Sequence, residues 1–204
     1  MSRIGNLLCL VCLLGLIGLQ APAAALAADT VYFSDDFENG DGNWIVNEQD
    51  WKLSTTSARS ATHSLSFSPY AANADASAQL LNPLDLSAAA APVLSFWHKS
   101  DIPDSGDAGY VDVSVDGGTT WTNLTTYSLK TVATWSNVQI DLSNYRGATV
   151  SIRFRLKSNS NTTVGNGWFI DDLQIKEKDS ATLALPFSDD FESGLGSWVL
   201  SGQD

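Results

Sequence analysis

The sequence predicts an all-β protein in which two antiparallel sheets pack as a jelly-roll sandwich. The main observation is that apolar and polar residues alternate with a period of two, whereas no segment carries a sustained helical stripe. A second observation is that clusters of Gly, Asp, Asn, Ser and Pro separate the alternating segments. About eight to ten short strands joined by turns are typical of a two-sheet sandwich.

The expected strands can be taken in chain order. The weaker patterns cover 33–37, 51–53, 64–67 and 78–81, and the clearer ones cover 93–98, 110–115, 138–142, 150–156 and 168–175. The pattern at 150–156 is the clearest, because Arg153 and Arg155 alternate with apolar residues and are expected to face solvent. The alanine-rich run at 88–91 lies between two prolines, which favours a crossover loop over a helix.

The N-terminal residues 1–27 are predicted to be a secretory signal peptide. Arg3 precedes an apolar core, and Ala25-Leu26-Ala27 provides a cleavage pattern of small residues. An uncleaved membrane anchor is the alternative, but the apolar run is short for a span. Both cysteines lie in this leader, so the mature chain would contain no disulfide. We therefore expect a secreted or cell-surface protein with no membrane span after cleavage.

Acidic side chains dominate the charge of the chain, with 23 Asp and Glu against 11 Lys and Arg and a net charge of −12. Such a surface repels nucleic acid and anionic lipid, so nucleic acid is not an expected partner. Most of the acids are aspartates, which are typical of turns and oxygen-rich loops. Divalent cations and neutral sugars remain as candidate ligands, and solubility alone is the simpler explanation.

Two acidic clusters begin and end the predicted module: Asp-Asp-Phe-Glu at 35–38, and Asp171 with Asp172. The first and last strands of a jelly roll commonly pair, so we expect these clusters to meet at one edge. Converging carboxylates repel one another unless a cation lies between them, and hard oxygen ligands suit Ca²⁺. Strict alternation would put Phe169, Asp171 and Leu173 on one face of the last strand. The alternative role of these acids is to cap turns by accepting backbone N–H bonds.

The segment from Ser114 to Trp121 matches an Asp-box pattern, Ser-x-Asp-x-Gly-x-Thr-Trp. We expect a hairpin turn in which Asp116 accepts backbone N–H bonds, two glycines adopt positive φ and Trp121 packs over the turn. A sialidase-type propeller would need several copies of this motif, and the sequence contains one. The motif is therefore predicted to be structural.

The sequence suggests no catalytic residues. Its two histidines, His63 and His98, do not form a His-Glu-x-x-His helix, and there is no Gly-x-Ser-x-Gly elbow. A jelly-roll glycoside hydrolase with paired carboxylates, Glu38 among them, is the enzymatic alternative. Large aromatic residues either stack on sugar rings at the rim or fill a cysteine-free core, and we favour the core. They are Trp44, Trp51, Trp97, Trp121, Trp135 and Trp168.

The motif that opens the module returns near the C-terminus. Residues 33–44 and 187–198 share the pattern Phe-Ser-Asp-Asp-Phe-Glu-x-Gly-x-Gly-x-Trp. The offset of about 154 residues is the size of a domain rather than of a solenoid repeat. We therefore predict four parts: a signal peptide at 1–27, a module at 28–178, a linker at 179–186 and the start of a truncated second repeat at 187–204.

Together these motifs resemble a MAM-like jelly-roll domain of the kind appended to bacterial secreted proteins, including immune-inhibitor-A-type metallopeptidases. The resemblance is carried by the motifs at 33–44, Leu-Ser-Phe-Trp-His at 94–98, the strand and Asp-box at 111–121, Ile-Asp-Leu-Ser-x-Tyr at 140–145 and Gly-Trp-Phe-Ile-Asp-Asp-Leu at 167–173. It implies a concanavalin-like, non-catalytic sandwich of adhesive or substrate-binding type, often with a structural cation. Animal MAM domains have conserved disulfides, which this mature chain could not form.

The resemblance also implies a site and a function. Carried onto this chain, the cation candidates are Asp36, Glu38, Asp171 and Asp172, holding a structural Ca²⁺. We expect a non-catalytic secreted or cell-surface binding or adhesion module that recognises a glycan or an extracellular protein. The alternatives are an accessory tail of a secreted metallopeptidase and, with less support, a jelly-roll glycoside hydrolase.

Overall fold

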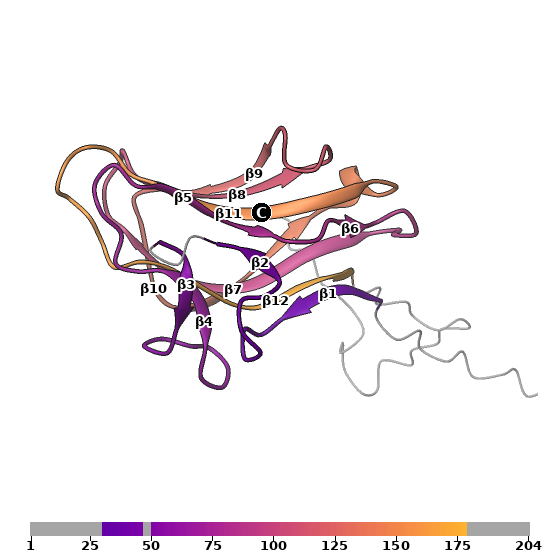
Figure 1. Ribbon diagram of the computed structural model, residues 1–204, viewed down its shortest axis with the longest axis horizontal. Coiled ribbons are helices and arrows are strands. Elements are labelled where there is room, and N and C mark those ends of the chain that lie inside the picture. The colour runs from indigo at the N-terminus through magenta and orange to yellow at the C-terminus, as the bar shows by residue number, and fades with distance from the viewer. Residues whose placement is uncertain (1–29, 47–49, 179–204) are drawn as a thin grey trace, which may run out of the picture. The chain divides into compact units, whose positions relative to one another are not determined.

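Two antiparallel sheets form the sandwich that the computed structural model describes over residues 30–46 and 50–178. Sheet A contains β1 (Val31–Asp35), β3 (Lys52–Ser54), β4 (Ser64–Phe67), β7 (Pro92–Ile102), β10 (Lys130–Asp141) and β12 (Gly167–Glu177). Sheet B contains β2 (Trp44–Ile45), β5 (Asp75–Leu80), β6 (Leu84–Asp85), β8 (Ala108–Ser114), β9 (Thr122–Tyr127) and β11 (Thr149–Lys157). Figure 1 shows the two layers, with β12 and β1 in one and β8 and β11 in the other. The predicted all-β, two-sheet antiparallel architecture is confirmed.

The strand order joins distant parts of the chain. Sheet A has the order β10-β7-β12-β4-β3, with β1 also paired to β12, and sheet B has the order β2-β5-β11-β8-β9, with β6 also paired to β11. The pairing of β1 with β12 aligns Ser34 with Gln174 and Asp35 with Leu173. The first and last strands of the module therefore lie side by side, as predicted.

Every strand expected from the sequence is present, and three further strands were missed. β2 and β6 are two residues long, which is too short for an alternating pattern. β9 has the sequence Thr-Asn-Leu-Thr-Thr-Tyr and lies at a sheet edge, so few of its residues needed to be apolar. The run at 88–91 is a loop, as expected, and the described residues contain one 3₁₀ turn, Ser143–Tyr145, but no α-helix.

Three predicted parts of the chain cannot be compared with the structure. The leader at 1–27, the linker at 179–186 and the second repeat at 187–204 all lie outside the described residues. Over the residues that are described, no helix is long and apolar enough to cross a membrane.

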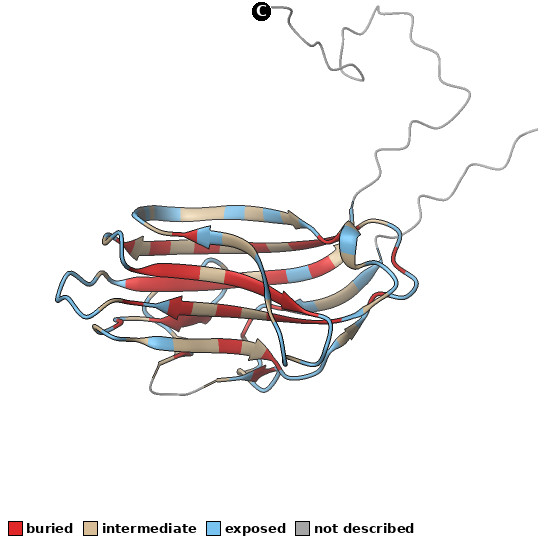
Figure 2. Ribbon diagram, turned by 90° about the horizontal axis from the view of Figure 1, so that it is seen from above, coloured by how far each residue is buried: buried red, intermediate tan, exposed pale blue. Residues whose placement is uncertain are grey.

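Apolar side chains from both sheets form the core. In β11, Val150, Ile152, Phe154 and Leu156 are each at most 1% exposed, which confirms the predicted alternation. The Phe154 ring lies 5.1 Å from that of Phe96 between centroids, and this contact joins sheet B to sheet A. Figure 2 shows buried residues running along the central strands while loops and edges are exposed. Aromatic pairs of this kind add to the stabilisation that burial provides.

The tryptophans divide between the core and the outer faces. Those in the core are at most 5% exposed and are Trp44, Trp51 and Trp168, so the predicted core role is confirmed for them. Trp97 and Trp121 are half-buried, and each ring is covered by a guanidinium, from Arg59 and Arg153 respectively, at 4.3 Å. Such a cation–π contact stabilises the pair but occupies the ring face that a ligand would use.

The predicted alternation of β12 is wrong beyond Asp171. A β-bulge shifts the pairing of β12 with β7 between Asp171 and Gln174, and Asp172 has a φ of 46°. The extra residue reverses the faces, so Trp168 and Ile170 share the core with Leu173 and Ile175. Phe169 therefore lies on the opposite, outer face from Leu173, although it was expected on the same one.

The Asp-box forms the structural turn that the sequence predicts. Asp116 accepts bonds from the Thr120 N–H at 2.9 Å and the Thr120 hydroxyl at 2.6 Å. Gly117 and Gly118 have φ values of 71° and 90°, and the Trp121 indole donates to the Gly118 carbonyl at 3.0 Å. The bonds that Asp116 accepts, chiefly the one from the Thr120 hydroxyl, lower the pKa of Asp116 to about 2.

Candidate functional site

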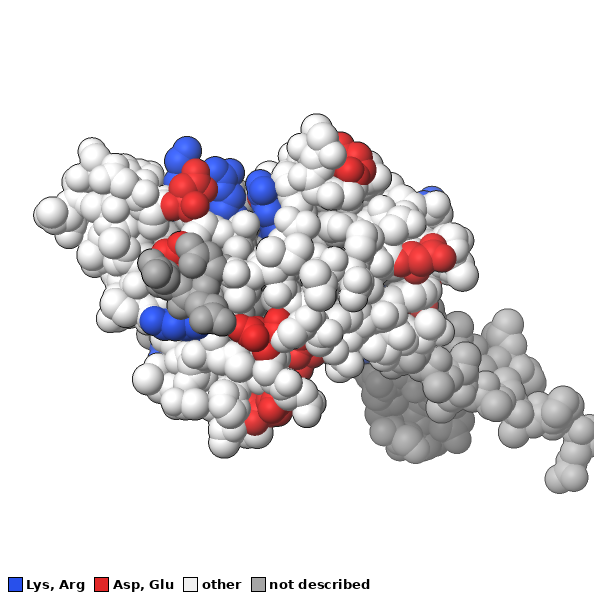
Figure 3. Space-filling view, viewed as in Figure 1, with Lys and Arg blue, Asp and Glu red and all other residues white. Residues whose placement is uncertain are grey.

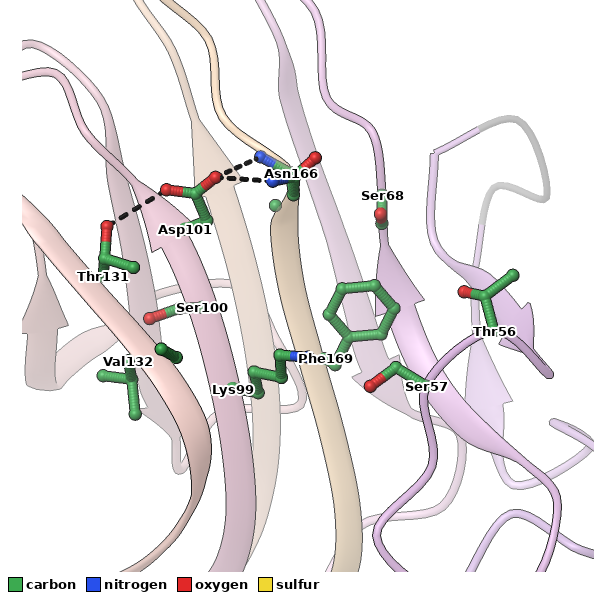
Figure 4. Close-up of a pocket in the computed structure, with 12 residues that line it drawn as sticks. Thr56, Ser57, Ser68, Lys99, Ser100, Asp101, Thr131, Val132, Asn166 and Phe169 are labelled. Atoms are coloured by element: carbon green, nitrogen blue, oxygen red, sulfur yellow. Dashed lines mark hydrogen bonds between the residues drawn. The ribbon is translucent and has the colours of Figure 1, made fainter.

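A cavity of about 460 Å³ lies on the outer face of sheet A, and we call it the Phe169 pocket. It lies across β10, β7 and β12 and reaches the ends of β3 and β4 (Figure 4). Its lining residues are Thr56, Ser57, Ser68, Lys99, Ser100, Asp101, Thr131, Val132, Ala133, Asn166, Gly167 and Phe169. The pocket thus combines one aromatic ring with a majority of hydroxyl, amide and charged groups.

Asp101 organises one end of the Phe169 pocket. One carboxylate oxygen accepts the Thr131 hydroxyl at 3.0 Å, and the other accepts the backbone N–H and side-chain amide of Asn166 at 3.0 and 2.8 Å. Figure 4 shows the carbonyl oxygen of the Asn166 side chain turned away from Asp101. Asp101 therefore fixes the orientation of Asn166 and leaves that oxygen as an acceptor for a ligand.

The middle of the Phe169 pocket holds its apolar and cationic groups. Phe169 is 8% exposed, and in Figure 4 the ammonium end of Lys99 points toward its ring. Ser100 lies beside them and is 2% exposed. Its hydroxyl is the one buried side-chain polar atom without a hydrogen-bond partner among the residues that the structure describes. Because side chains alternate along β7, this hydroxyl lies on the core face of the strand with Phe96 and Ile102, opposite to Lys99 and Asp101.

One wall of the Phe169 pocket belongs to the loop at 55–63, which connects β3 to β4. Asp171 accepts the N–H groups of Arg59 and Ser60 at 2.7 and 3.2 Å. Asp172 accepts the Arg59 guanidinium at 2.8 Å and the Ser60 hydroxyl at 2.7 Å. Since Thr56 and Ser57 of the same loop line the pocket, these carboxylates position its wall.

Glu38 fastens the other end of the 55–63 loop. Its carboxylate accepts the Thr62 hydroxyl at 2.7 Å and the N–H groups of Thr62 and His63 at 3.0 and 2.6 Å. These bonds, led by that of the Thr62 hydroxyl, lower the pKa of Glu38 to about 2. By contrast, burial raises the pKa of Asp171 despite its N–H donors.

The four predicted cation ligands do not converge on one point, and Asp171 and Asp172 lie on β12, an interior strand of sheet A. Asp36 and Asp172 line a second, more polar cavity of about 410 Å³ together with Asp35. Glu38 and Asp171 instead face the N–H groups of the 55–63 loop. Within 30–46 and 50–178, no three or more His, Cys, Asp or Glu side chains are grouped as a metal ion would require. The structural Ca²⁺ therefore stays a prediction.

The bonds of Glu38 predict a pH dependence of stability. Because the pKa falls from an ordinary 4.5 to about 2 on folding, the contribution of Glu38 is complete above pH 4.5 and is lost as the pH falls toward 2. The Glu38→Gln variant should therefore lie further below the wild type in unfolding free energy at pH 6 than at pH 2. Urea denaturation across this pH range measures the difference, and a constant gap between the two proteins would contradict the assignment.

The sequence did not single out the residues of the Phe169 pocket. Lys99, Asp101 and Asn166 are ordinary polar residues on strands and turns, and Phe169 was expected on the same face as Leu173 because the bulge was not foreseen. The run Trp-Phe-Ile-Asp-Asp at 168–172 carried the available signal, since apolar residues on both sides of a strand indicate that both faces are covered.

Part of the module is similar in sequence to one family model, and the chain is similar to one curated protein. Residues 82–176 match the family model for Reelin subrepeat B, so the family that matches is not the MAM family. Bacillopeptidase F from Bacillus subtilis (strain 168) is 28% identical over 160 residues, which cover 73% of this chain. The same stretch covers only 11% of that relative, so the chain spans a small part of its length.

Solved structures share the fold at low sequence identity. TmCBM61 in complex with β-1,4-galactotriose has a TM-score of 0.52 and 18% identity, covering 72% of this chain and 99% of that one. The C-terminal family 22 carbohydrate-binding module of Clostridium thermocellum Xyn10B has a TM-score of 0.50 and 19% identity, covering 74% and 96%. The likeness concerns the fold, and it agrees with the jelly-roll topology described above.

Proposed function

We propose that this chain carries a non-catalytic binding module for glycans that acts outside the cell, with the Phe169 pocket as its site. The observation that carries the proposal is the composition of this pocket, in which one aromatic ring lies among hydrogen-bonding groups from β7, β10, β12 and the 55–63 loop. Sugars present apolar C–H faces and polar hydroxyl rims, so they match a ring bordered by amides and hydroxyls.

The comparisons support this function without assigning a ligand. TmCBM61 was solved in complex with β-1,4-galactotriose. Export is supported by the leader-like residues 1–27. An adhesive role of the MAM type would be a more specific form of this proposal.

We also infer that the module is not itself an enzyme. Glu38, the carboxylate named for the glycosidase alternative, is occupied by donors from Thr62 and His63. The two carboxyl groups of a glycosidase must instead flank the scissile bond. The 28% identity with Bacillopeptidase F favours one second candidate, an accessory segment of a secreted peptidase. Such a segment would also work by binding.

A binding experiment tests the proposal directly. The purified chain is applied to a glycan array, and bound oligosaccharides are then titrated by calorimetry. Phe169→Ala should weaken binding at least about tenfold, because it removes the one aromatic ring in the lining of the pocket. Trp121→Ala is the matched control, since it removes an aromatic ring from the Asp-box turn beside sheet B and should leave affinity unchanged.

Thermal melting of both variants separates a lost site from a lost fold. The proposal fails if a folded wild-type chain binds no glycan, or if folded Phe169→Ala binds the same glycan with wild-type affinity.

A further inference from the structure

The Phe169 pocket contains one anionic and one cationic side chain, and they differ in the number of partners that they have within the protein. Asp101 carries the pocket's negative charge, and its two oxygens accept three hydrogen bonds from Thr131 and Asn166. Lys99 carries the positive charge. The ion pairs recorded within residues 30–46 and 50–178 involve Arg59, His63, Arg153 and Arg155, and none involves Lys99. Among the described residues, the pocket therefore holds one anion with hydrogen-bond donors and one cation without an anionic partner.

A ligand that fills the pocket will remove water from the Lys99 ammonium. The Lys99 side chain is already half-buried, and its ammonium end points toward the Phe169 ring (Figure 4). A neutral ligand would desolvate the ammonium and offer only weak dipoles in exchange, which costs free energy. A carboxylate would instead form a charge-assisted hydrogen bond, which is shorter and stronger than one between neutral groups.

The rest of the molecule argues against a polyanion. Lys99 is the single Lys or Arg among the described residues that line the pocket. The whole chain has a net charge of −12, which repels a ligand with many negative charges. On the face seen in Figure 3, basic side chains form small separate groups interspersed with acidic ones and no continuous basic track. The pocket is suited to one acidic group on an otherwise neutral ligand.

The remaining groups of the pocket suit the other parts of a sugar. Phe169, which is 8% exposed, adds the apolar part of the lining. The side-chain oxygen of Asn166 that is turned away from Asp101 can accept a hydroxyl hydrogen, and Ser57 and Ser68 carry hydroxyls that donate or accept.

We propose that the Phe169 pocket binds a sugar residue that carries a carboxylate, such as a uronic or a sialic acid, with Lys99 pairing to that carboxylate. The inference rests on the proposed glycan-binding function and names the class of sugar. Asp101 acts as a positioning residue for Asn166 and keeps its own charge away from the ligand.

Calorimetric titrations with matched sugars test the proposal on the full chain. Trigalacturonate is compared with its methyl ester, and sialyllactose with lactose, so that the two sources of a sugar carboxylate are distinguished. At least one acidic sugar should bind at least about tenfold more tightly than its neutral counterpart, the ratio expected for one charged hydrogen bond. Raising the salt concentration from about 50 to 500 mM should reduce this preference.

Variants assign the preference to Lys99. Lys99→Met keeps the length and apolar stem of the side chain and should abolish the preference while weak neutral binding persists. Lys99→Arg should retain it, because the charge remains. Lys157→Met removes an exposed charge from β11 in the other sheet and is the matched control. Thermal melting confirms that each variant is folded.

The outcomes distinguish a failure of this inference from a failure of the proposed glycan-binding function. Equal affinity for acidic and neutral sugars, a preference that survives in Lys99→Met, or tight binding of sulfated but not carboxylated sugars would each overturn the carboxylate assignment and leave glycan binding intact. No binding of any sugar, acidic or neutral, by the folded wild-type chain would overturn the proposed function and this inference together.

Discussion

Replacing Gly167 by alanine is expected to abolish or nearly abolish cooperative folding. A Cβ at this position would lie 1.9 Å from the Phe67 carbonyl oxygen and 3.2 Å from the Ser68 Cα, both backbone atoms that cannot rotate away. Gly167 also has a φ of 91°, which L-residues rarely adopt. Relief would require β12 to separate from β4 where Trp168 pairs with Phe67. We expect a loss above about 4 kcal/mol, a large share of the stability of a typical domain.

A second glycine separates the two causes of this effect. Gly40 has a φ of 101°, but nothing lies within 4 Å of the Cβ it would gain. Gly40→Ala should therefore cost only the backbone strain, about 1–2 kcal/mol. Urea denaturation followed by tryptophan fluorescence compares the two variants. Equal losses would show that the close approach of β12 to Phe67 does not constrain the fold.

Asp35→Ala is expected to have the second-largest effect. The carboxylate is 8% exposed and accepts the Phe37 N–H at 2.8 Å, the Asn43 amide at 3.0 Å and the Trp44 indole N–H at 2.9 Å. Its removal leaves two buried donors, the Phe37 N–H and the Trp44 indole N–H, without a partner, and each such loss costs about 1–3 kcal/mol. We expect a total loss of about 3–5 kcal/mol.

Two comparisons make the Asp35 prediction specific. Asp36 is exposed and, among the described residues, accepts the Glu38 N–H alone, at 3.2 Å, so Asp36→Ala should change the unfolding free energy by no more than about 0.5 kcal/mol. Trp44→Phe keeps an aromatic ring but removes the indole donor. In a double-mutant cycle, Asp35→Ala and Trp44→Phe should couple by about 0.5–3 kcal/mol. A coupling of zero would show that this hydrogen bond does not stabilise the module.

The Asp35 network also explains what the repeated motif encodes. The second copy carries Asp189, Phe191 and Trp198 at the positions of Asp35, Phe37 and Trp44. In the first copy these residues close the segment that joins β1 in sheet A to β2 in sheet B. The conserved spacing between the two copies is thus the spacing that the hydrogen bonds require. The fold of the second copy itself stays a prediction.

The sequence by itself determined the fold class, the positions of the longer strands and most of the core. In β11, for example, apolar residues at every second position predicted which side chains are buried. This was possible because the free energy of burial depends on the chemistry of each side chain. The Asp-box turn was equally predictable, because its bonds join residues within one short segment. The pairing of the first and last strands followed from jelly-roll topology.

Only the tertiary structure determined which residues form the candidate binding site. The bulge in β12 depends on its register with β7, so no local pattern reveals that Phe169 faces outward. Three of the predicted cation ligands, Glu38, Asp171 and Asp172, instead accept hydrogen bonds from the 55–63 loop. The donors to Asp171 are more than 100 residues away in the sequence, so no local pattern predicts them. The Phe169 pocket likewise joins Ser57, Lys99, Thr131 and Asn166, which share no sequence pattern. Burial can be predicted from the polarity of each residue, whereas the composition of a site depends on which strands become neighbours in the folded chain.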